Sequence, residues 1–149
     1  MTLNLRGNNM ADNIIINRIW QDSDFFQIEI ECQTDLIVAR SKVYTSNDLI
    51  DDLYIKIEQF LLGNSSIICW RNGEQGDATT PCISFTFSHH DALGHVRIEV
   101  YLEIDDGGQL SIHNCCFYVI TEIGLLYQFK EKLPILKNPQ LGVHVSLDC

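Results

Sequence analysis

The chain has 149 residues, 46% of them hydrophobic and 20% charged, which is the composition of a folded domain and not of a disordered segment. Its 20 acidic and 10 basic residues give a formal charge of −10, which disfavours binding to nucleic acid or to an anionic membrane. A basic protein is the partner that this charge would attract.

The sequence predicts a cytoplasmic protein. It has no apolar run of the about 18 residues that predict a transmembrane helix, and its first residues lack the basic and apolar regions of a signal peptide. We expect a polar tail at residues 1–12 and a single α+β domain at residues 13–149. We expect its six cysteines to be free, buried thiols, because they lie mostly in apolar, strand-like segments: Cys32, Cys69, Cys82, Cys115, Cys116 and Cys149.

Three strands are predicted before the first helix. Residues 13–20 are rich in isoleucine and end at a polar turn, and residues 25–33 alternate between apolar and polar side chains. Residues 35–44 form a third strand that leads directly into a helix. The sequence Thr45-Ser46-Asn47-Asp48 offers N-cap oxygens, and Gly63 stands where a C-terminal cap is expected. One apolar helical face is made by Leu49, Ile50, Leu53, Tyr54, Ile57, Phe60 and Leu61.

The second half predicts more strands and a second helix. We expect strands at residues 66–70, 82–88, 95–104, 110–120 and 141–147, with a loop at 71–81, a hairpin connection at 89–94 and a tight turn at 105–108. The apolar side of residues 110–120 changes partway, which indicates a bulge or a central strand. Thr121 can cap a helix that Pro134 ends.

These elements favour an α+β fold: a mainly antiparallel sheet of about six to eight strands with two helices packed on one face. A partly closed barrel or a sandwich is the alternative.

No residue pattern predicts a catalytic, metal or cofactor site. His89, His90, Asp91 and His95 resemble metal ligands, but neighbouring strand residues point to opposite faces, so we interpret them as polar turn residues. The same divergence separates Cys115 from Cys116. The sequence contains no nucleophile motif, and we expect its acidic side chains to lie on solvent-exposed faces of strands and helices.

One surface is predicted to bind a partner. Glu29 and Glu31 on one strand, and Glu99, Tyr101 and Glu103 on another, should share the sheet face turned away from the helices. A tyrosine among carboxylates suits a basic protein, because aromatic side chains anchor interfaces and acidic groups steer the approach of a cation.

The order of elements resembles small bacterial immunity proteins of the WapI type. The likeness rests on residues 26–32, on Ser41-Lys42-Val43-Tyr44 with the helix that follows, on the strand Gly94-His-Val-Arg-Ile-Glu-Val100, and on the apolar spacing of the last helix. It covers residues 13–136 and transfers no binding residue.

The resemblance implies a cytoplasmic antitoxin that is no enzyme and holds no cofactor. Such a protein binds the toxic domain of a secreted or contact-delivered toxin and blocks its active site. That domain would be basic, for example a nuclease, and the antitoxin would be a monomer or homodimer. The alternatives are a small-molecule-binding or enzymatic α+β domain with a pocket between sheet and helices, and a structural subunit of a larger assembly.

Overall fold

The computed structural model describes residues 12–77, 79–105, 107 and 113–148. Eight strands and two α helices follow one another along these residues, which confirms the α+β class. The elements are β1 (Asn13–Gln21), β2 (Phe26–Gln33), β3 (Val38–Thr45), α1 (Asn47–Leu61), β4 (Ile67–Asn72), β5 (Ile83–His89), β6 (His95–Glu103), β7 (Asn114–Glu122), α2 (Ile123–Lys132), the 3-10 helix η3 (Leu133–Lys137) and β8 (His144–Ser146).

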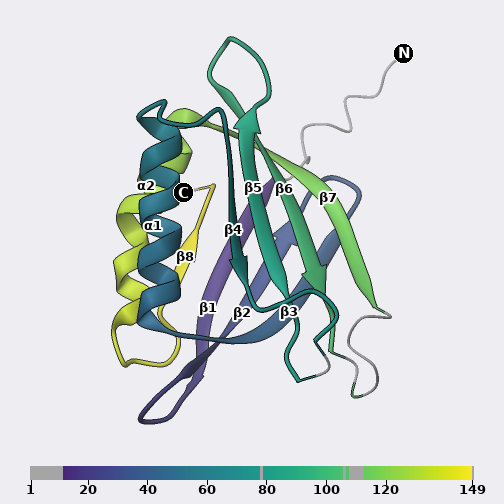
Figure 1. The fold of residues 1–149 in the computed structure, drawn as a ribbon, viewed down its shortest axis with the longest axis vertical. Coiled ribbons are helices and arrows are strands. Elements are labelled where there is room, and N and C mark those ends of the chain that lie inside the picture. Colours follow the sequence, from purple (N-terminus) through teal and green to yellow (C-terminus); the bar gives the residue numbers. More distant parts are fainter. Residues whose placement is uncertain (1–11, 78, 106, 108–112, 149) are drawn as a thin grey trace, which may run out of the picture.

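The strands form two four-stranded sheets, in the orders β3-β2-β1-β8 and β4-β5-β6-β7. Every strand pair is antiparallel, as predicted, and the division into two sheets corresponds to the sandwich-like alternative. The sheets cross each other, and both helices lie side by side on one side of them (Figure 1). The inner faces share one core, in which Ile28 and Ile30 of β2 join Ile98 and Val100 of β6. The outer faces therefore point away from each other.

The first helix agrees closely with its prediction. The Ser46 hydroxyl accepts a hydrogen bond from the Leu49 N–H at 3.3 Å, and Gly63 ends the segment with a φ of 77° that favours glycine. The core-facing side chains are Ile50, Leu53, Ile57 and Phe60. The helix has 15 residues, too few to cross a bilayer, and the described residues contain no candidate membrane-spanning helix.

Several predicted boundaries are wrong, for local reasons. The third strand begins at Val38, because the Thr34 N–H bonds to the Ile37 carbonyl and closes a turn that leaves Leu36 93% exposed. Strand β4 continues to Asn72, into the expected loop. Thr121 is a buried residue within β7, and Glu122, the last residue of that strand, is the N-cap of α2.

The bulge or central position predicted for the strand at 110–120 is also wrong for the residues that the structure describes. Residues 110–112 lie outside the described residues, and β7 pairs with β6 in unbroken register at the edge of its sheet. A register shift does occur in β1, between Arg18 and Trp20.

The thiols differ in burial. Five described cysteines are free: Cys32 and Cys82 are buried, Cys115 is half-buried, and Cys69 and Cys116 are exposed. The prediction of burial is therefore wrong for the last two, which lie on outward-facing strand positions. Burial raises the pKa of the Cys32 thiol and raises that of Cys82 to about 11.

Truncating the core face of α1 should destabilise the protein. Leu53 is fully buried, so Leu53→Ala should lower the free energy of unfolding by about 2–5 kcal/mol in urea denaturation. The matched control is Ile55→Ala on the exposed side of the same helix, expected within about 1 kcal/mol of the unchanged protein. Equal losses for both variants would contradict this packing.

Candidate partner-binding cleft

The five residues expected to form one binding surface lie in three places. Glu29 and Glu31 lie on the outer face of β2, whereas Glu99 and Tyr101 lie on the outer face of β6 in the other sheet. Glu103 is completely buried. The prediction that these residues share a face is therefore wrong, because the strands that carry them belong to different sheets.

Glu103 is buried because the loop at 73–82 folds over it. Its Oε1 accepts the Cys82 N–H at 2.9 Å, and its Oε2 accepts the Gly76 N–H at 3.0 Å and the Tyr101 hydroxyl at 2.8 Å. Burial and this hydrogen bond to Glu103 raise the pKa of Tyr101 to about 12. The carboxylate thus fixes the path of a loop, and it is unavailable to a partner.

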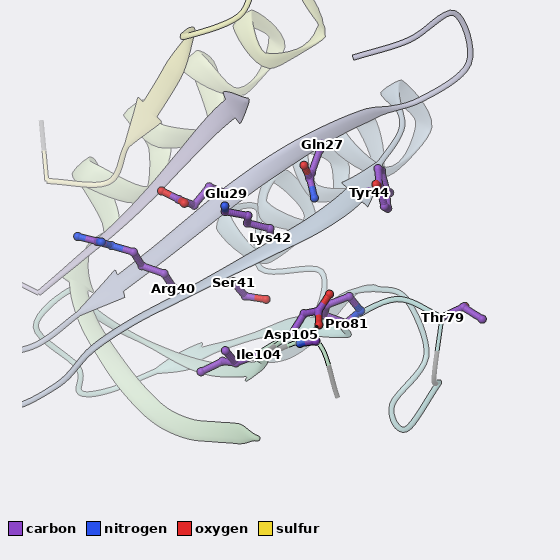
Figure 2. A pocket seen from close by; sticks show the side chains of 11 residues that line it. Gln27, Glu29, Arg40, Ser41, Lys42, Tyr44, Thr79, Pro81, Ile104 and Asp105 are labelled. Carbon is purple, nitrogen blue, oxygen red and sulfur yellow. Dashed lines mark hydrogen bonds between the residues drawn. The ribbon is translucent and has the colours of Figure 1, made fainter. Parts of the chain in front are cut away.

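The face expected to be acidic is balanced by cations on β3. Lys42 lies opposite Glu29 in the strand register, and Arg40 lies opposite Glu31, with 3.2 Å between Arg40 Nη2 and Glu31 Oε1. These residues border a groove of about 430 Å³ between the outer side of β2–β3 and a second wall that contains Thr79, Pro81, Ile104, Asp105 and Gly107. Figure 2 shows Glu29, Arg40 and Lys42 extending from the two strands on one side, and Pro81, Ile104 and Asp105 on the other.

An apolar cleft of about 590 Å³ adjoins this groove, and Tyr44 and Thr79 line both. We call it the aromatic cleft, lined by Trp20, Asp22, Phe25, Tyr44, Leu49, Asn72, Gly73, Thr79 and Thr80. Its aromatic side chains are largely open to solvent: Trp20 is 43% exposed, Phe25 56% and Tyr44 51%. Clusters of exposed aromatic side chains are typical of binding surfaces.

The bulge in β1 places Trp20 in this cleft. Residues Ile14, Ile16 and Arg18 point inward, so simple alternation would also turn Trp20 inward. The shift after Arg18 pairs Trp20 with Gln27, an outward position, and Gln27 pairs in turn with Tyr44. Trp20 and Tyr44 then meet edge to face above the sheet, with ring centroids 5.8 Å apart.

Asp22 shapes the turn that presents Phe25. Its Oδ1 accepts the N–H groups of Asp24 at 2.8 Å and Phe25 at 2.7 Å, and these bonds lower the pKa of Asp22. The carboxylate is therefore ionised at neutral pH. A further hollow of about 510 Å³ adjoins the cleft here, with Asp24 and Asp48 in its lining.

The end of strand β4, at Asn72, and the loop residues Gly73, Thr79 and Thr80 form one wall of the cleft. The Trp70 indole N–H donates to the Leu49 carbonyl, and Asn72 Nδ2 donates to the Tyr44 carbonyl, each at 3.0 Å. Two buried atoms of this wall, Asn72 Oδ1 and Thr80 Oγ1, make no hydrogen bond with the described residues. Buried polar atoms are almost always paired, so these two mark the wall as unusual.

The histidine cluster serves the local fold. The His95 Nδ1 lies 2.6 Å from Asp91 Oδ2, His90 bonds to Arg97, and the His89 ring stacks on Phe60 with centroids 4.7 Å apart. The described residues contain no group of three side chains suited to hold a metal ion. Likewise Cys115 and Cys116 diverge: Cys115 packs against the core, and Cys116 donates to Glu99 at 3.5 Å.

The sequence held a signal for the cleft that the alternation pattern did not use. Trp20 and Phe25 flank a short polar turn, where side chains are exposed. The contributions of Asn72 and Thr80 could not be found in this way, since they depend on how the loop at 73–82 folds.

The chain matches no known family model, and searches of curated proteins and of solved structures found no significant match.

Glu103→Gln should destabilise the protein. The NH₂ group of the glutamine would face at least one of the N–H or O–H groups that now donate to Glu103. We therefore expect the free energy of unfolding in urea to fall by about 1–3 kcal/mol. Glu99→Gln, on the outer face of the same strand, is the control and should change the free energy of unfolding by less than about 1 kcal/mol. A Glu103→Gln protein as stable as the control would show that the carboxylate does not hold the loop.

The stabilising effect of the Tyr101 hydroxyl should disappear at high pH. Because folding raises its pKa from 10 to about 12, the neutral hydroxyl contributes stability that is complete below pH 10 and is lost as the pH rises towards 12. The measurement is the difference in free energy of unfolding between the unchanged protein and Tyr101→Phe across this range. A difference that does not decrease would refute the Tyr101–Glu103 hydrogen bond.

Proposed function

We propose that this chain is a cytoplasmic immunity protein that binds and neutralises a cognate secreted or contact-delivered bacterial toxin. The observation that carries the proposal is the aromatic cleft: three exposed rings in an acidic chain, with no basic side chain among the described residues of its lining. The proposed role agrees with the WapI-type resemblance of the sequence.

The cleft has the physical properties of a protein anchor point. Tryptophan and tyrosine dominate the residues that contribute most to interface energies, and they do so where surrounding contacts exclude water. The adjoining groove and hollow extend the surface on both sides of the rings, which suits a protein partner better than a small ligand.

The charge of the chain supports a basic partner, such as a nuclease domain with a cationic substrate cleft. Asp22 lines the aromatic cleft, and Asp24 and Asp48 line the adjoining hollow together with Arg18 and Lys137. The formal charge of −10 would speed the approach of a cationic surface. Inhibition would then be stoichiometric occlusion of the toxin's active site, without catalysis or cofactor, by a monomer or homodimer.

A small-molecule-binding role is the second candidate. The volume of about 590 Å³ and the apolar lining with a few polar groups are typical of ligand sites. A thermal-shift screen of small molecules that raises the melting temperature, with the rise abolished by Trp20→Ala, would favour this role.

The test of the immunity role is a protection assay. The immunity role predicts that a neighbouring gene encodes a large secreted protein. The C-terminal domain of that protein is expressed in a host cell with and without the chain, and growth is followed. We expect rescue and co-purification of the two proteins. If the domain is toxic and this chain neither restores growth nor binds the domain, that pairing is excluded.

The binding surface is tested with matched tyrosine variants. Tyr44→Ala in the cleft should weaken toxin binding by about 2 kcal/mol, or about 30-fold in Kd. Tyr118→Ala on the outer face of β7 is the control, because both tyrosines are 51% exposed, and it should leave Kd within about twofold. Calorimetry measures both, and equal effects would place the interface elsewhere.

A further inference from the structure

The starting observation is a pair of buried acceptors at one site. Asn72 is only 2% exposed, and its amide donates through Nδ2 to the Tyr44 carbonyl while Oδ1 accepts nothing from the described residues. Thr80 Oγ1 is in the same state and lines the same cleft. A buried acceptor without a donor costs free energy that a bound donor would recover.

The rings above these acceptors favour a cation. A cation that lies within about 6 Å of an aromatic ring face is attracted by the quadrupole of the ring, most strongly by tryptophan. Trp20 meets Tyr44 edge to face, so the two rings present surfaces of different orientation, and Phe25 adds a third ring from the turn between β1 and β2.

The charge of the lining favours the same occupant. Among the described residues, Asp22 is the one charged residue that lines the aromatic cleft, and its ionised form is held by the backbone N–H groups of Asp24 and Phe25. No lysine, arginine or histidine of the described chain belongs to the lining. Arg18 and Lys137 border the adjoining hollow, where Arg18 donates to the Leu136 carbonyl and Lys137 pairs with Asp51 at 2.7 Å.

We propose that the aromatic cleft binds the guanidinium group of an arginine side chain presented by a protein partner. The group would stack against the rings and donate to the Asp22 carboxylate, and a small displacement of the cleft wall would bring it within reach of the buried Asn72 Oδ1. This inference rests on the proposed function in one respect, that the partner is a basic protein.

Arginine fits the cleft better than the other candidates. Its planar group stacks on aromatic faces and carries five N–H donors in a fixed geometry, so it can reach several acceptors at once. An ammonium group is a compact, strongly hydrated charge and loses more hydration in an apolar cleft. An apolar side chain would leave Asn72 Oδ1 unpaired.

The experiment is an NMR titration of the full chain with acetyl-Gly-Arg-Gly-amide. We expect saturable chemical-shift changes at the Trp20 indole N–H, the Asn72 side-chain amide and the backbone of Phe25. The same peptide with citrulline, which has nearly the same shape without the charge, should bind about tenfold more weakly or not measurably. Peptides with lysine or leucine in place of arginine test the two other occupants.

Two variants locate the binding. Tyr44→Ala should weaken arginine-peptide binding at least about threefold. Tyr118→Ala is the control and should not change this binding. Tyr118 is as exposed as Tyr44, and its ring already lies 5.2 Å from the Arg97 guanidinium. Equal binding of the citrulline or leucine peptide, or shifts spread over all acidic surfaces, would overturn the proposal.

The outcome can be separated from that of the protection assay. If the chain protects against a toxin but the arginine peptide causes no shifts at the cleft, the arginine site is wrong and the immunity role stands. If the peptide binds in the cleft and no toxin is neutralised, the site stands and the role is wrong.

Discussion

The hydrogen bonds of one buried carboxylate hold together the surface on which the functional proposal depends. Glu103 is the only carboxylate that the described part of the chain buries completely, and it accepts hydrogen bonds from Gly76, Cys82 and Tyr101. Its carbonyl also accepts the Ser41 hydroxyl, which joins β3 of one sheet to β6 of the other. A buried charge left without these partners would be strongly unfavourable, so the loop at 73–82 and the sheet edge are held together. Thr79 and Thr80 of that loop form one wall of the aromatic cleft.

The same residue shows where reading a strand by alternation fails. Glu99, Tyr101 and Glu103 have the same parity along β6, and two of them do lie on the outer face. Alternation assigns a residue to a face of its sheet, but whether that face is open depends on loops that cover it. The loop over Glu103 has no periodicity, so its fold could not be predicted from the sequence. For the same reason the five expected binding residues could not be assigned correctly to a common surface: which strands pair is decided by tertiary packing.

The sequence predicted well those features that are determined within a single helix or strand. The apolar face of α1, the Ser46 cap and the alternation in β2 and β6 each follow from a repeat that is visible within one element. The register shift in β1 is of another kind, because one additional residue moves Trp20 to the outer face while the composition of the strand stays the same. The cleft thus arises at the point where the local pattern breaks.

The distribution of charge separates two contributions to binding. On β2 and β3, carboxylates face cations in register, so this part of the surface is nearly neutral in spite of the formal charge of the whole chain. Long-range attraction then comes from the whole acidic molecule and is screened by salt, and it acts mainly on the rate of association. In the proposed complex, the rings and Asn72 would act only at contact, and they would determine how long the complex lasts. A change of salt and a change of Tyr44 should therefore alter different rate constants, which is expected when an acidic chain attracts many cationic surfaces but holds only one.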